Sequence, residues 1–322
     1  MTTPSLATQV RGGDRRALAR AITLVESTRD ADRAAAGQLL DDLLVGGARN
    51  AIRVGISGAP GVGKSTLIEA LGLHVIDEGH RVAVLAVDPS SARSGGSILG
   101  DKTRMELLAR APDAYIRPSP SAGAVGGVAR RTREAMLVCE AAGFDVVLVE
   151  TVGVGQSDTA VADMVDVFVL LVAPGGGDEL QGIKRGVMEL ADVVAVTKAD
   201  GDLASTANQT VADYRHALHL LRPKRPGWEP TVVLSSALRR DGIDKVWDAV
   251  IEQRESLDAA ESLTKLRSDQ AVAWFWNEVR ERVLAELTHD EMVRVRVHEL
   301  EAAVAAGELS PSAAATKLLA DR

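Results

Sequence analysis

The chain has 322 residues, of which 46% are hydrophobic and 25% charged, and its formal net charge is -8. This length predicts one central domain with extensions, and the composition is typical of globular proteins. The negative charge argues against nucleic acid or an anionic membrane as a partner, because both attract basic surfaces. Aromatic residues make up only 3%, so we expect a core of Ala, Val, Leu and Ile.

The sequence gives no sign of export or of membrane insertion. The start, MTTPSLATQVRGGDRR, holds no apolar signal core, and no uninterrupted apolar run is long enough to cross a bilayer. The single cysteine, Cys139, excludes an intrachain disulfide and lies among apolar residues, so we expect it to be buried in a helix. These features predict a cytoplasmic protein.

Residues 1–50 form the first of three zones and predict helices. Leu18, Ile22 and Val25 recur at helical spacing, and Asp14 is placed to cap the start of their helix. A second stripe of leucines runs from 39 to 44 and ends at two glycines. We therefore predict an N-terminal helical extension.

Residues 51–257 alternate apolar runs with helical stretches. The runs are 52–57, 81–87, 145–150, 166–172, 192–198 and 231–236, most of them continuously apolar and rich in valine. Such runs are typical of parallel strands that helices cover on both faces. Helices are predicted between them, for example over 64–78, 127–142 and 204–221. The pattern predicts an α/β domain with a doubly wound, mainly parallel sheet.

From residue 258 to residue 322 the strands stop and the pattern is helical throughout. Trp274, Phe275 and Trp276 stand together in this third zone. Two interpretations of this aromatic cluster stay open. It either docks the segment on the main domain or forms a subunit interface, where aromatic side chains are enriched.

The segment GAPGVGKST follows the first apolar run and fits the phosphate-loop pattern completely. Its glycines let the backbone wrap phosphates with N–H groups, and the helix that follows adds a positive dipole end. Lys64 is predicted to neutralise the β- and γ-phosphates, and the Ser65 hydroxyl to ligate Mg²⁺. The predicted nucleotide-binding residues of this segment are Gly58, Ala59, Pro60, Gly61, Val62, Gly63, Lys64, Ser65 and Thr66.

Acidic residues at the ends of two later runs are placed to complete a metal site. Asp88 follows the run 81–87, and Glu150 ends the run 145–150. In an open parallel sheet, ligands bind beyond the carboxyl ends of the strands. Both carboxylates are therefore predicted to hold Mg²⁺, directly or through water.

The glycine-rich segment 95–105, GGSILGDKTRM, is predicted to close over the γ-phosphate. Asp101 and Lys102 are its expected active groups, and Asp101 is also a predicted metal ligand. The alternative is a surface loop in which Asp101 caps a helix that starts near Thr103.

The run that ends in TKAD predicts which base is bound. The Asp200 carboxylate can accept hydrogen bonds from the N1–H and the 2-amino group of guanine, whereas adenine offers no such donor pair. The stem of Lys198 can lie over the base plane. Ser235, Ser236 and Ala237 end the next strand, where backbone N–H groups are expected near the guanine O6. The sequence therefore predicts GTP rather than ATP.

Six motifs in order resemble the MeaB/ArgK family of GTPases, in the metallochaperone branch of the SIMIBI phosphate-loop class. They are GAPGVGKST, DPSS, GGSILGDKTRM, ETVGVGQ, GGGDELQGIKRG and TKAD, within about residues 53–236. The helical ends agree with that family's N-terminal extension and C-terminal dimerisation arm, although they hold no diagnostic motif. The resemblance implies a homodimeric GTPase that assists cofactor loading onto adenosylcobalamin-dependent methylmalonyl-CoA mutase and protects it.

The resemblance also implies roles for individual residues. It implies phosphate and Mg²⁺ binding by Lys64 and Ser65, metal binding and hydrolysis by Asp88, Asp101 and Glu150, and guanine recognition by Lys198 and Asp200. Residues 175–186 would transmit the nucleotide state to the mutase, with Lys184 as an active residue. Lys64, Asp101 and Glu150 form the predicted catalytic set.

Two other functions stay open. An older label for the family is a kinase of periplasmic amino-acid-binding proteins, in arginine and ornithine transport. A nickel-insertion GTPase of the same class needs clustered Cys or His ligands, and only His216 and His219 are close in this sequence. A polar helix face is the alternative interpretation of that pair.

The hydrolysis step lacks a familiar residue. Many small GTPases place a water-orienting Gln directly after DxxG, whereas this chain has Val154 after Gly153. Gln156 lies nearby but not in the equivalent place. We therefore expect slow intrinsic hydrolysis that a partner accelerates.

Overall fold

The computed structural model describes residues 5–45, 50–88, 105–120, 125–151, 156–175, 185–221, 224, 228–259, 261–289 and 291–320. Contacts within the chain divide it into two compact units, Met1–Gln270 and Ala271–Arg322. The division falls inside one long helix, α14 (Ser262–His289). The three zones expected from the sequence, 1–50, 51–257 and 258–322, stay a prediction.

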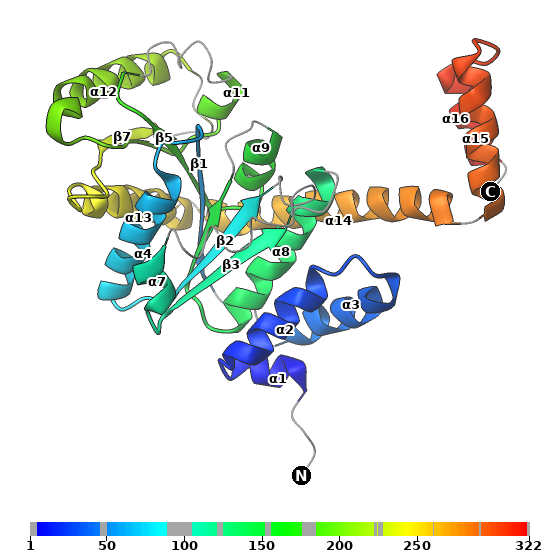
Figure 1. The fold of residues 1–322 in the computed structure, drawn as a ribbon, viewed down its shortest axis with the longest axis horizontal. Coiled ribbons are helices and arrows are strands. Elements are labelled where there is room, and N and C mark those ends of the chain that lie inside the picture. Colours follow the sequence, from blue (N-terminus) through cyan, green and yellow to red (C-terminus); the bar gives the residue numbers. More distant parts are fainter. Residues whose placement is uncertain are drawn as a thin grey trace. The chain divides into compact units, whose positions relative to one another are not determined.

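The first unit is built on a seven-stranded sheet whose strands all pair in parallel (Figure 1). The strands are β1 (Ile52–Gly58), β2 (Val82–Asp88), β3 (Ala114–Pro120), β4 (Val146–Glu150), β5 (Val167–Val172), β6 (Val193–Val196) and β7 (Thr231–Leu234). Their order across the sheet is β3-β2-β4-β1-β5-β6-β7. The predicted α/β fold with a parallel sheet is confirmed, and each of the six predicted runs contains a strand.

Strand β3 is missing from the sequence-based prediction. Its sequence, AYIRPSP, contains an arginine and two prolines, so it lacks the continuous apolar run of the other strands. Among the described strands β3 pairs only with β2, and it forms one edge of the sheet. Proline cannot donate a ladder hydrogen bond and is tolerated at an edge. The strand therefore forms with a composition that would not suit the centre of the sheet.

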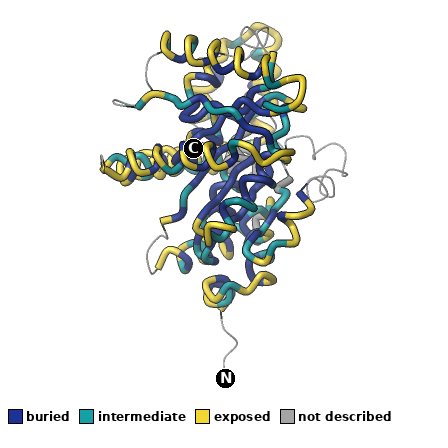
Figure 2. The backbone as a smooth tube through the Cα atoms, turned by 90° about the vertical axis from the view of Figure 1, so that its left-hand side faces the viewer, coloured by how far each residue is buried: buried dark blue, intermediate teal, exposed yellow. Residues whose placement is uncertain are grey.

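Helices cover both faces of this sheet. α4 (Lys64–Asp77), α7 (Glu106–Arg110) and α13 (Ile243–Ala259) share one core with the strands, while α8 (Val125–Ala141) and α9 (Gln156–Ala162) pack on the other side. α12 (Ala204–His219) packs on β6 and β7, with α11 (Arg185–Met188) and the 3₁₀ turn η1 (Gly201–Leu203) in the connections. The buried strands and the exposed outer sides of the helices are seen in Figure 2.

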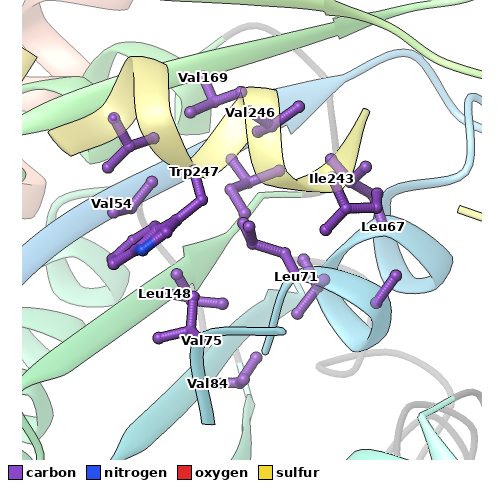
Figure 3. Packing of buried hydrophobic residues seen from close by; sticks show 14 of the residues in the cluster. Val54, Leu67, Leu71, Val75, Val84, Leu148, Val169, Ile243, Val246 and Trp247 are labelled. Atoms are coloured by element: carbon purple, nitrogen blue, oxygen red, sulfur yellow. The ribbon is translucent and has the colours of Figure 1, made fainter. Parts of the chain in front are cut away.

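The core between α4, α13 and the sheet consists of alternating strand residues and one stripe from each helix. Val54 and Leu148 point from the sheet towards Leu71 and Val75 of α4 and Trp247 of α13 (Figure 3). Each of these side chains is at most 2% exposed. Burying an aliphatic side chain of this size stabilises the fold by about 1.5–3 kcal/mol. The core fixes α4, whose first turn carries the last phosphate-loop residues, Lys64, Ser65 and Thr66.

Three N-terminal helices, α1 (Leu6–Arg11), α2 (Arg15–Val25) and α3 (Asp30–Leu44), pack on α8. Asp14 caps α2 as predicted, since its carboxylate accepts backbone hydrogen bonds at 2.7 and 3.0 Å. The predicted stripe of Leu18, Ile22 and Val25 is buried. Cys139 is buried in α8, also as predicted, and burial raises the pKa of its thiol.

The second unit contains the later part of α14, α15 (Glu291–Ala305) and α16 (Pro311–Ala320). α15 and α16 pack together and bury Leu300 and Ala314. Phe275 is 60% and Trp276 56% exposed, and their rings meet edge-on at 5.4 Å. The described residues include no helix that is long and apolar enough to cross a membrane.

Candidate functional site

The phosphate loop joins the carboxyl end of β1 to the start of α4. Gly58 has a φ of 154°, and a Cβ there would lie 2.5 Å from the Leu171 carbonyl oxygen. Gly63 has a φ of 103° and precedes α4 without supplying a side-chain cap. The first N–H groups of a helix need acceptors from outside it, and phosphate oxygens are suitable acceptors. The glycines of the motif thus create a helix start without a side-chain cap, beyond the carboxyl end of β1.

The Lys64 amine is held inside this loop. Its Nζ donates hydrogen bonds to the carbonyl oxygens of Gly58, at 2.7 Å, and Ala59, at 3.1 Å. Burial lowers the pKa of Lys64, while the nearby Glu150 and Asp158 carboxylates oppose that shift. A charge in a partly buried place acts on a neighbouring phosphate more strongly than it would in water. The position suits the predicted phosphate-neutralising role.

Ser65 and Glu150 meet beyond the carboxyl ends of the central strands β1 and β4. The Ser65 hydroxyl donates a hydrogen bond of 3.1 Å to Glu150 Oε1. Glu150 ends β4 and lies opposite Ile56 of β1, which explains why residues 85 positions apart come together. A hydroxyl and a carboxylate are both hard oxygen ligands, so this pair fits Mg²⁺.

The remaining predicted metal ligands are less completely placed. Asp88 ends β2, two residues beyond the position that pairs with Glu150, and its side chain lies outside the described part of the chain. Asp101 lies outside it altogether. His216 and His219 are exposed on α12, and the described residues contain no group of three or more His, Cys, Asp or Glu side chains able to hold a metal.

The TKAD segment follows β6 and is tied to the phosphate loop. Thr197 Oγ1 donates to the Val62 carbonyl at 2.8 Å, and Lys198 Nζ donates to the Gly61 carbonyl at 2.8 Å. Lys198 has a φ of 53°, in the left-handed region that a non-glycine residue rarely occupies. The chain therefore places the predicted base-binding segment and the predicted phosphate-binding segment side by side.

Asp200 is positioned by the residues that directly follow β7. The Ser236 hydroxyl donates a hydrogen bond to Asp200 Oδ2, and the Ala199 backbone N–H donates to the Ser235 carbonyl at 3.1 Å. Ala237 follows directly and is partly buried. These contacts gather the residues predicted to recognise guanine, although their role in binding stays a prediction.

One buried group at the site has no counterpart in the sequence-based prediction. Asp158, in the first turn of α9, accepts hydrogen bonds of 2.7 Å from both Ser57 and Thr151 hydroxyls. Ser57 precedes the phosphate loop and Thr151 follows Glu150, so both adjoin predicted site residues. The only sequence signal is a serine inside the apolar run of β1.

Several predicted functional groups lie outside the described residues. They are Asp101 and Lys102 in the segment 95–105, Gly153 and Val154, and Lys184 in the segment 175–186. Gln156 begins α9, but its side chain is not described. The described site thus consists of the phosphate loop, Ser65 with Glu150, the Asp158 contacts and the TKAD region.

Comparisons with known proteins agree with this arrangement. The sequence model of the family described as methylmalonyl-CoA mutase-associated GTPase MeaB matches residues 18–292. A putative GTPase of Caulobacter vibrioides is 55% identical over 316 residues, covering 98% of this chain and 96% of that protein. The mouse protein named methylmalonic aciduria type A homolog, mitochondrial, is 49% identical over 316 residues, covering 95% and 76%.

A solved structure resembles the whole chain. The crystal structure of a protein named LAO/AO transport system kinase superposes with a TM-score of 0.77 at 42% sequence identity, covering 97% of this chain and 95% of that one. Similarity therefore extends over the central domain and over both helical ends.

Proposed function

This chain belongs to the MeaB family of methylmalonyl-CoA mutase-associated GTPases, and we propose that it uses GTP hydrolysis to assist and protect an adenosylcobalamin-dependent methylmalonyl-CoA mutase. GTP is the substrate, with GDP and phosphate as products. The observation that carries the proposal is the family match over residues 18–292, which includes the whole described site. The assistance consists of gating the loading of the cobalamin cofactor.

The described side chains account for phosphate binding. In the proposed complex, Lys64 moves its hydrogen bonds from the Gly58 and Ala59 carbonyls to the β- and γ-phosphates. The uncapped start of α4 supplies N–H donors to the same oxygens. The chain thereby positions the γ-phosphate for attack by water, with little covalent chemistry of its own.

The metal part of the proposal rests on oxygen ligands. Ser65 and Glu150 would hold Mg²⁺, with Asp88 and Asp101 as further ligands, directly or through water. When bound, Mg²⁺ supplies positive charge to the phosphate oxygens. Asp101 and Glu150 are also proposed to take part in hydrolysis.

Guanine selection is assigned to the TKAD region and the following strand end. Asp200 would accept the two guanine donors, while Ser236 keeps its carboxylate oriented. The stem of Lys198 would cover the base, and the backbone at Ser235 and Ala237 would reach the O6 atom. The contact of Lys198 with Gly61 supports this arrangement, because it fixes the distance between base and phosphates.

The mutase is proposed to act on the hydrolysis rate through the segments 95–105 and 175–186, with Lys184 as a coupling residue. Hydrolysis is measured with and without the mutase, for the original chain and for Lys184→Ala. We expect slow turnover alone, acceleration by the mutase, and loss of that acceleration in the variant. An unchanged rate on adding the mutase would contradict the coupling.

The association itself is tested separately. The mutase is captured on a resin, and binding of this chain is compared with GDP and with a non-hydrolysable GTP analogue. A difference between the two nucleotides supports the gating proposal. Negligible binding in both states contradicts the chaperone function but leaves the GTPase activity standing.

A homodimer is proposed from the second unit. Phe275 and Trp276, on α14, each expose more than half of their surface. Exposed aromatic side chains are typical of surfaces that contact another subunit. Sedimentation of the original chain should give twice the monomer mass, and replacing Phe275 and Trp276 by serine should lower it. A monomer in the original chain contradicts the dimer. The predicted cytoplasmic location stays a prediction.

One observation favours a second function, namely the similarity to a crystal structure whose protein is named LAO/AO transport system kinase. The two functions differ in where the γ-phosphate goes. Incubation with γ-labelled GTP should release labelled free phosphate if the chain acts as a GTPase chaperone. Label retained on an added periplasmic binding protein would support the kinase.

A further inference from the structure

The Asp158 carboxylate is a buried polar group beside the phosphate site. The residue is 3% exposed and lies in the first turn of α9. A single oxygen, Oδ1, accepts hydrogen bonds of 2.7 Å from Ser57 Oγ and from Thr151 Oγ1. Both donor residues are themselves 1% exposed. The three side chains form one buried polar cluster.

One donor lies on a strand and the other directly follows a strand. Ser57 is the residue before Gly58, where the phosphate loop leaves β1. Thr151 follows Glu150 at the end of β4, and its backbone N–H donates to the Ile56 carbonyl at 3.0 Å. Asp158 therefore joins the base of the phosphate loop, the residue after the metal-binding carboxylate, and the start of α9.

Apolar packing alone does not require such a cluster. Burying a carboxylate and two hydroxyls costs free energy unless they are hydrogen-bonded to one another, and valine or leucine could fill the same space without that cost. Hydrogen bonds supply direction that apolar contacts lack. The cluster therefore fixes the mutual orientation of the three segments.

The cluster also lies within electrostatic range of the phosphate-binding lysine. The negative charge of Asp158 acts to raise the pKa of Lys64, in the same direction as the charge of Glu150. Asp158 is thus part of the charge environment of the site. Its contacts to Ser57 and Thr151 give it a geometric role as well.

We propose that Asp158 is a positioning residue for GTP hydrolysis, which acts through Ser57 and Thr151 to hold the phosphate loop, Glu150 and the start of α9 in one fixed arrangement. The inference rests on the GTPase activity and on the proposed metal role of Ser65 and Glu150. It is independent of the mutase. Small displacements of groups that position reactants lower the chemical rate more than they lower binding.

The test measures hydrolysis by the full-length chain without any partner, over a range of GTP and Mg²⁺ concentrations. Asp158→Asn keeps the size of the side chain and one oxygen acceptor but removes the charge, so the hydrogen bonds from Ser57 and Thr151 become weaker, neutral ones. We expect kcat to fall about tenfold or more, with KM for GTP changed less than about threefold. We also expect a higher Mg²⁺ concentration for half-maximal rate, because Glu150 is held less firmly.

A second pair of variants keeps the test informative if Asp158→Asn does not fold. Thr151→Val removes one donor at almost constant volume, whereas Thr151→Ser retains it. Loss of kcat in the valine variant and its retention in the serine variant support the proposal. If the cluster acts as a unit, the double variant Asp158→Asn with Thr151→Val is no slower than the slower single variant.

Asp163→Asn is the matched control, because it makes the same chemical change at an exposed residue just after α9. Folding of every variant is checked by its thermal midpoint. Folded Asp158→Asn and Thr151→Val proteins that both keep a kcat within about twofold of the original overturn the inference. The inference is also overturned if Asp163→Asn loses kcat and GTP affinity to the same extent as Asp158→Asn. An original chain that does not hydrolyse GTP instead contradicts the GTPase assignment.

Discussion

Thr197 and Val62 are 135 residues apart in the chain, yet the Thr197 hydroxyl donates a hydrogen bond of 2.8 Å to the Val62 carbonyl oxygen. The same hydroxyl lies 3.2 Å from the Val172 carbonyl oxygen at the end of β5. Thr197 is 4% exposed. One buried side chain thus joins the end of β6 to the middle of the phosphate loop.

Replacing Thr197 by valine should weaken nucleotide binding. Valine keeps the volume but leaves the Val62 carbonyl without this donor, so the free energy of unfolding should fall by about 1–3 kcal/mol. We expect affinity for GDP and GTP to fall about 5- to 10-fold, since the two halves of the site lose a fixed contact. Titration with a fluorescent GDP and urea unfolding measure the two effects. Thr197→Ser, which keeps the hydroxyl, is the control; equal affinities in both variants would contradict the role.

Replacing Asp200 by asparagine should change the choice of base. In the proposed complex the carboxylate accepts two donors from guanine, whereas an amide would offer one donor and one acceptor. GTP affinity should fall at least about 100-fold. Xanthine carries a carbonyl where guanine carries the 2-amino group, so affinity for xanthosine triphosphate should rise.

Competition between the two nucleotides measures the change in base selection. Asp202→Asn, two residues along the same turn at an exposed position, is the control and should leave the preference for guanine unchanged. Equal loss of both nucleotides in Asp200→Asn would show that Asp200 supports the fold of the site without reading the base.

The phosphate loop and the TKAD segment could be named as candidate sites from sequence because each motif consists of neighbouring residues, so spacing alone carries the signal. Asp158 could not, because its partner Ser57 lies on β1 and its partner Thr151 directly follows β4, and no local spacing relates all three residues. β3 was missed for a different reason. An edge strand tolerates Pro118 and Arg117, so its sequence lacks the apolar run used to find the others.

Breaking the buried pair of Arg53 and Glu140 should lower stability strongly. Arg53 Nε and Nη2 bind the two Glu140 oxygens at 2.6 and 3.1 Å, and both residues are at most 4% exposed. Glu140→Gln leaves a buried guanidinium without its counter-charge, so we expect a loss of about 3–5 kcal/mol. Urea unfolding measures it.

The exposed pair of Lys265 and Asp269 provides the comparison, at 3.1 Å and one helical turn apart. Asp269→Asn should cost less than about 1 kcal/mol, because water and salt screen such pairs. Similar losses for Glu140→Gln and Asp269→Asn would mean that water reaches the pair at Arg53.

Stability should fall in alkaline solution because of Tyr115. Burial, with a smaller contribution from Cys139, raises its pKa to about 12. The unfolded chain releases this proton near pH 10, and the folded chain releases it only near the raised pKa. The stabilisation is therefore present below about pH 10 and is lost as pH rises towards the raised pKa of the folded chain. Allowing for its partial exposure, the loss is about 1 kcal/mol at about pH 11.

Tyr115→Phe isolates that contribution, because it removes the ionisable group and retains the ring. Free energies of unfolding are compared at about pH 9 and at about pH 11 for both chains. The original chain should lose more stability over this interval than the variant. Identical losses would mean that the Tyr115 hydroxyl titrates alike in the folded and unfolded chains.

The central place of β1 has a consequence for how the protein is made. β1 pairs only with β4 and β5, and β5 ends at Val172. During synthesis the strand before the phosphate loop therefore emerges long before its two neighbours, and its apolar side chains lack their final contacts for more than 100 residues of elongation. Such a nascent segment is exposed to aggregation. Because Gly58 pairs with Leu171, the start of the phosphate loop reaches its final contacts only after β5 has been synthesised.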